Sequence, residues 1–189
     1  MELLDQHRRA TAEFDRRVQP VPEDRWHVGT PCEGWDARDL VNHLVVELLW
    51  APHVLAGETL EDVGDRYDGD QLGDDPAAAW AGAALVAREA ITTPGALDAT
   101  VHTSMGLIPA EEYVRQLVLE LTVHAWDLAR AISVDEFLDP ELVEELYQEW
   151  RPRAAELAVA GAFAEPVDVP GAADPQTQLL ALLGRDPRR

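Results

Sequence analysis

The stretch from Pro109 to about Ile132 constrains the fold more than any other part of the chain. Its apolar residues recur at the spacing of one helix face, and a proline followed by acidic residues is typical of a helix start. Glu120 and His124 lie four residues apart on the same apolar face. Because a carboxylate is rarely buried without a partner, this helix predicts a polar or metal site inside the protein.

Helical periodicity recurs along most of the remaining chain. The pattern predicts helices over about 3–18, 37–56, 76–93, 140–157 and 175–183. Pro152 should kink the helix over 140–157. A loop is predicted over 58–75 and an extended piece over 99–103. The predicted fold class is all-α, an antiparallel four-helix bundle with a short C-terminal extension. We expect residues 1–160 to form the bundle and residues 161–189 to pack on it within the same domain.

Composition excludes several classes of function. The net charge of -21 opposes binding to nucleic acid and to anionic membranes, so neither is expected as a partner. The absence of lysine removes Schiff-base, pyridoxal phosphate and P-loop chemistry. A single cysteine, together with the lack of an apolar signal or membrane segment, predicts a cytoplasmic protein. We expect a monomer or a homodimer.

A third potential ligand comes from the second predicted helix. That helix begins after Asp36, the predicted N-cap, and it carries His43 on the shoulder of its inner face beside Glu47. If this helix packs against the helix of Glu120 and His124, two imidazoles and one carboxylate converge. Such a set suits zinc, with nickel or iron as alternatives, and it leaves a coordination position open. A buried polar pair without a metal is the competing interpretation.

Other polar residues are candidates for supporting roles. Glu47 can act as a base or orient a ligand, although a solvent-facing or arginine-paired glutamate fits equally well. Asp127 can orient a ligand or pair with Arg130 or Arg115. The other histidine, cysteine and tryptophan residues of interest are expected to have structural roles. We expect His7 in the core, His102 at the surface or a pocket rim, and Cys32 in a turn. Three tryptophans should pack around the second helix: Trp26, Trp35 and Trp50.

Two long motifs and a short one resemble a known family. They are PCEGWDARDLVNHL at 31–44, ELTVHAWDLARA at 120–131 and GRDP at 184–187. Together they resemble the metal-binding proteins of the DinB-like superfamily, and more narrowly the metal-binding domain of mycothiol-dependent maleylpyruvate isomerase. The resemblance implies a DinB-like bundle whose divalent metal, usually zinc, is held at the positions of His43, Glu120 and His124.

The resemblance also implies a class of activity. Relatives of known activity use mycothiol, bacillithiol or glutathione in isomerase or S-transferase reactions. We therefore expect a transferase or isomerase that acts on a low-molecular-weight thiol, such as mycothiol, and a small electrophile. Residues 161–189 are too few to supply the C-terminal domain of the isomerase, so maleylpyruvate itself is not the expected substrate. The alternatives are a non-catalytic metal- or ligand-binding bundle and a metal-dependent hydrolase.

Overall fold

The computed structural model describes residues 1–104, 106–153 and 163–188. The chain divides into two compact units, one formed by Glu2–Glu136 and the other by Phe137–Arg189 together with Met1. The predicted boundary between residues 160 and 161 falls outside the described residues, so that division stays a prediction.

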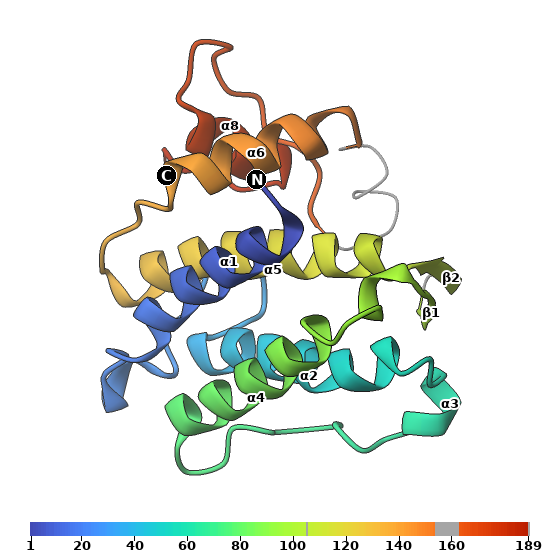
Figure 1. Ribbon diagram of the computed structural model, residues 1–189. Coiled ribbons are helices and arrows are strands. Elements are labelled where there is room, and N and C mark those ends of the chain that lie inside the picture. The colour runs from blue at the N-terminus through green and yellow to red at the C-terminus, as the bar shows by residue number, and fades with distance from the viewer. Residues whose placement is uncertain (105, 154–162, 189) are drawn as a thin grey trace. The chain divides into compact units, whose positions relative to one another are not determined.

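Four long helices build the first unit: α1 (Leu3–Val18), α2 (Ala37–Leu55), α4 (Pro76–Ile91) and α5 (Ala110–Ile132). Helix α1 packs along α5 and α2 packs along α4, while contacts of α2 with α5 and of α1 with α4 close the bundle. Figure 1 shows that α2 and α4 run in one direction and α1 and α5 in the other. The predicted all-α, DinB-like four-helix bundle is therefore confirmed.

Local sequence sets where these helices begin and end. The side chain of Asp36 accepts a hydrogen bond from the backbone N–H of Asp39, and Asp39 returns the interaction to the backbone of Asp36. This predicted cap typically contributes about 1 kcal/mol. Proline follows the cap of α4 directly, and α5 ends where Ser133 adopts φ 62°, a left-handed conformation that cannot continue a helix.

The connections contain more regular structure than the sequence predicts. A short helix, α3 (Leu60–Val63), interrupts the predicted loop, and Asn42 of α2 anchors the following segment by accepting from the backbone N–H of Gln71 at 2.7 Å. The predicted extended piece is β1 (Thr100–Thr103), which pairs antiparallel with β2 (Gly106–Pro109). The remaining short elements are the 3₁₀ turns η1 (Glu23–Arg25) and η2 (Ala96–Asp98).

Helix α5 is buried on almost every side, and not only along one stripe. From Leu117 to Ala129 every residue is buried except Glu120, which is partly exposed. An interior helix with this pattern leaves few positions for polar groups. The polar residues that α5 does bury therefore require partners, and those partners define the candidate site.

The second unit contains α6 (Pro140–Trp150), the 3₁₀ turn η3 (Arg151–Arg153) and α8 (Pro175–Leu182), and α6 packs on α8. The sequence predicts a helix kinked at Pro152, but α6 ends at Trp150 and the proline lies in the following turn. A proline inside an α-helix removes a backbone hydrogen bond, which explains the earlier end. Residues 154–157 of the predicted helix lie outside the described residues.

Among the described residues, no helix combines the length and the apolar character that crossing a membrane requires.

Candidate metal site

The structure brings the three predicted ligands together. His43 comes from α2, and Glu120 and His124 come from successive turns of α5; one ligand atom from each lies within 4.8 Å of the other two. His43 Nε2 lies 3.2 Å from Glu120 Oε2. The packing of α2 on α5 supplies the contact that the spacing of Glu120 and His124 alone could not.

The site is more accessible from one side than from the other. The side chains of His43 and Glu120 are 27% and 21% exposed, whereas that of His124 is 7% exposed. An ion among these donors would meet solvent on the side of His43 and Glu120. Three protein ligands with one accessible side match the arrangement of catalytic zinc sites, in which a fourth position remains open.

Asp127 determines the orientation of His124. Its Oδ2 atom lies 3.0 Å from His124 Nδ1, and its side chain is completely buried. An ionised carboxylate accepts the Nδ1 hydrogen, which makes Nε2 the nitrogen that could bind a metal ion. Of the two roles predicted for Asp127, orienting a ligand is the one that this contact supports.

Cys32 also lies at this site, although its position in the sequence did not predict this. Its thiol donates to Asp127 Oδ2 at 3.3 Å and lies 3.8 Å from His124 Nδ1, and the three side chains form a second group capable of holding an ion. The residue does occupy the predicted turn, where its backbone N–H donates to Thr30 Oγ1. Irregular turns have no periodicity, so no spacing rule connects Cys32 with α5.

Trp35 forms part of the same site. Its ring centroid lies 4.9 Å from that of His43 and 6.2 Å from that of His124. The prediction that Trp35 packs around the second helix is confirmed by its contact with His43, but the indole also covers both candidate ligands. An apolar cover of this kind restricts the rotamers of the imidazoles and limits access of water.

Burial and charge change the protonation of the residues around the site. Burial raises the pKa of Glu47 to about 7, and the nearby charge of Glu120 acts in the same direction. Burial alone would lower the pKa of His43, but the hydrogen bond and charge of Glu120, with the charge of Glu47, raise it above the usual value. Glu47 therefore belongs electrostatically to the same cluster as the candidate ligands.

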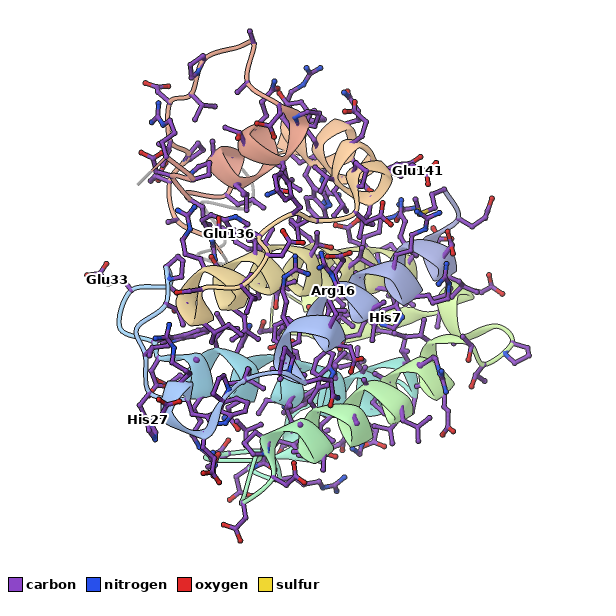
Figure 2. All side chains as sticks on the ribbon, turned by 90° about the vertical axis from the view of Figure 1, so that its left-hand side faces the viewer. His7, Arg16, His27, Glu33, Glu136 and Glu141 are labelled. Carbon is purple, nitrogen blue, oxygen red and sulfur yellow. The ribbon has the colours of Figure 1, made fainter. Side chains whose placement is uncertain are left out.

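The two remaining candidate histidines lie away from this cluster. His7, on α1 (Figure 2), is buried, and burial lowers its pKa to about 4. His102 is exposed on β1. Neither residue belongs to a group of potential metal ligands among the described residues. The interpretation of His7 as a core residue agrees with its burial.

Solved structures share this fold. The crystal structure of the mycothiol-dependent maleylpyruvate isomerase aligns with a TM-score of 0.62 and 18% identity, over 84% of this chain and 70% of that chain. A histidine-to-alanine mutant of the same enzyme aligns with a TM-score of 0.63 and 17% identity over the same shares. At this identity the likeness shows the fold alone.

Sequence comparison extends over the whole chain. Two Mycobacterium tuberculosis proteins, the uncharacterized proteins MT0763 (strain CDC 1551 / Oshkosh) and Rv0738 (strain ATCC 25618 / H37Rv), are each 32% identical over 202 aligned residues, covering 100% of both chains. Residues 7–129 match the family model described as the mycothiol maleylpyruvate isomerase N-terminal domain. This range contains all three candidate ligands, and the chain belongs to the mycothiol maleylpyruvate isomerase N-terminal domain family.

Proposed function

We propose that the protein binds a divalent metal ion, zinc in the first instance, through His43, Glu120 and His124 and uses it in a thiol-dependent reaction on a small electrophile. The convergence of these three side chains within 4.8 Å is the observation that carries the proposal. Two imidazole nitrogens and one carboxylate oxygen suit zinc, and nickel and iron accept the same donors. The orientation of His124 by Asp127 adds the hydrogen-bonded support that metal-binding histidines usually have.

A bound metal ion would lower the pKa of a thiol in the open position and hold it as the thiolate. The thiol proton then needs an acceptor, and Glu47 is the candidate because it interacts electrostatically with His43 and Glu120. Its burial, which raises the pKa of the carboxyl group, favours proton uptake there. The Trp35 ring packs against both histidines and would limit their rotation.

Mycothiol is the thiol that we propose. The solved structures with this fold belong to a mycothiol-dependent isomerase, and the family is described by the same thiol. We propose a transferase or isomerase reaction and leave the electrophile unspecified, because the comparison at 18% identity covers only the fold.

Elemental analysis of the purified protein tests the metal site. We expect about one ion per chain in the parent protein and little in His43→Ala or His124→Ala, because each variant removes one of only three protein ligands. His102→Ala is the matched control, since His102 is exposed and belongs to no potential metal group among the described residues. Equal metal content in all four proteins would disprove the assignment.

A thiol-consumption assay tests the reaction. The metal-loaded protein is mixed with mycothiol and a panel of small electrophiles, and loss of free thiol is followed with the parent protein and with Glu47→Gln. We expect turnover that falls by about a hundredfold in Glu47→Gln, the typical contribution of a general base. Metal binding without turnover across the panel would instead identify a non-catalytic metal-binding bundle.

A further inference from the structure

The hydroxyl group of Tyr113 is a polar group that the proposed function has not used. Tyr113 is 6% exposed, and its hydroxyl oxygen is buried without a hydrogen-bond partner among the described residues. Buried hydroxyl groups are normally paired, and each unpaired one destabilises the folded protein. An exception of this kind indicates a site where a water molecule or a ligand completes the hydrogen bond.

Tyr113 lies on the helix face that carries the proposed ligands. It precedes Glu120 by seven residues and His124 by eleven, intervals that correspond to about two and three helical turns. Helices α2 and α5 run in opposite directions (Figure 1). Moving along α2 from His43 to Glu47 therefore leads in the same direction as moving back along α5 from Glu120 toward Tyr113. Glu47 and Tyr113 therefore lie toward the same end of the site.

Electrostatic interactions agree with this placement. Burial raises the pKa of Tyr113 well above its usual value, and the charges of Glu47 and Glu120 raise it further. The phenol is thus a hydrogen-bond donor throughout the neutral range. The unpartnered hydroxyl of buried Tyr113, with the half-buried carboxyl group of Glu47 acting on it electrostatically, makes this end of the site suited to a polar ligand.

We infer that the Tyr113 hydroxyl donates a hydrogen bond to a carbonyl oxygen of the small molecule bound at the site. Tyr113 thereby selects ligands that carry an acceptor oxygen in addition to the sulfur atom bound at the site of His43, Glu120 and His124. This inference rests on the proposed thiol-binding function, and the oxygen can belong either to the thiol or to the electrophile. In either case Tyr113 is a specificity-determining residue.

Stability of the metal-free protein supplies the first test. Tyr113→Phe removes an unpaired hydroxyl, so its Tm should equal or exceed that of the parent protein. The matched control is Tyr67→Phe, which removes a hydroxyl that lies 2.8 Å from His53 Nε2 and should lower the Tm by roughly 2 °C or more. A Tm loss in Tyr113→Phe as large as that in Tyr67→Phe would show that the hydroxyl already has a structural partner and would overturn the inference.

Ligand discrimination supplies the second test. Cobalt-substituted protein is titrated with N-acetylcysteine methyl ester, which carries carbonyl oxygens, and with ethanethiol, which carries none, using the sulfur-to-cobalt charge-transfer band. We expect Tyr113→Phe to raise the Kd of the ester by roughly three- to tenfold and to leave that of ethanethiol unchanged. Tyr67→Phe should change neither value.

The two sources of the oxygen are separated by a third titration, in which cyclohexanone is added to the ethanethiol complex. An effect of Tyr113→Phe on the ester places the oxygen on the thiol, whereas an effect only on cyclohexanone binding places it on the electrophile. If both thiols bind and Tyr113→Phe has no effect in any titration, the inference about Tyr113 is overturned while the thiol-binding function stands. No charge-transfer band with either thiol in the parent protein would overturn the thiol-binding function and this inference with it.

Discussion

Helices α1 and α2 both pack on α5, and each carries a histidine that sequence periodicity places toward the interior, yet the two histidines have opposite electrostatic environments. Within the described part of the chain no acidic group acts on the ring of His7 on α1, and burial lowers the pKa of His7 to about 4. His43 on α2 faces Glu120, which raises its pKa despite burial. The difference teaches that the carboxylates across the α2–α5 contact, rather than burial of an imidazole, distinguish a candidate metal ligand from a core residue.

Removal of the carboxylate should cause the largest effect. Glu120→Gln should lower zinc affinity by about a thousandfold, more than the 10- to 100-fold typical of residues that only support a ligand. His7→Gln should leave zinc affinity unchanged. Competition with a chromogenic chelator measures both values, and equal losses in the two variants would remove the distinction between the two histidines.

The second effect concerns His7 and acid stability. Its pKa is lower in the folded protein, about 4, than the usual 6.5, so the unfolded chain binds more protons between these values. The free energy of unfolding should therefore fall by about 3 kcal/mol as the pH falls from 6.5 to 4. Urea unfolding of metal-free protein should show this slope reduced in His7→Gln, and an unchanged slope would contradict the assignment.

Glu47 should produce a smaller effect of the opposite sign. Its pKa is higher in the folded protein, about 7, than the usual 4.5, so the folded chain binds more protons between these values. The free energy of unfolding should fall as the pH rises from 4.5 to 7, by about 2 kcal/mol after allowance for partial solvent access. Glu47→Gln should lose this dependence, as measured by urea unfolding with a chelator present. Parallel pH profiles for the variant and parent would show that Glu47 is not buried beside Glu120.

The smallest effects should come from the residues that support His124. Asp127→Asn should lower zinc affinity by about tenfold, because the amide no longer fixes the hydrogen on Nδ1 as the carboxylate does. Cys32→Ser should lower it by about threefold or less, because Cys32 supports the candidate ligand His124 only through Asp127 and a longer contact to Nδ1. The same chelator competition measures both, and a larger loss in Cys32→Ser than in Asp127→Asn would make Cys32 a direct ligand.

The part of the site that depends on helical spacing could be predicted from the sequence. Glu120 and His124 fall on one face of α5, and the cap at Asp36 sets the phase in which α2 presents His43. Cys32 could not be predicted because its sulfur reaches Asp127 from an irregular turn 95 residues away, where neither a period nor a cap indicates direction. The approach of Trp35 to both histidines depends on the same turn.

The fold was predictable to a similar extent and for the same reason. Long amphipathic helices follow from local periodicity. The pairing of β1 with β2 could not be predicted in this way, because apolar and polar residues barely alternate along β2. The end of α6 at Trp150 was misplaced because the sequence cannot say whether a proline kinks a helix or terminates it.

X-ray absorption spectroscopy of the zinc-loaded protein tests the central claim most directly, because His124 is shared by two potential ligand groups. Binding by His43, Glu120 and His124 predicts only nitrogen and oxygen ligands, at about 2.0–2.2 Å, in the absence of added thiol. A sulfur ligand at about 2.3 Å should then appear when a thiol is added. A sulfur ligand that is already present in the thiol-free protein and disappears in Cys32→Ser would place the ion at Cys32, His124 and Asp127 and contradict the account.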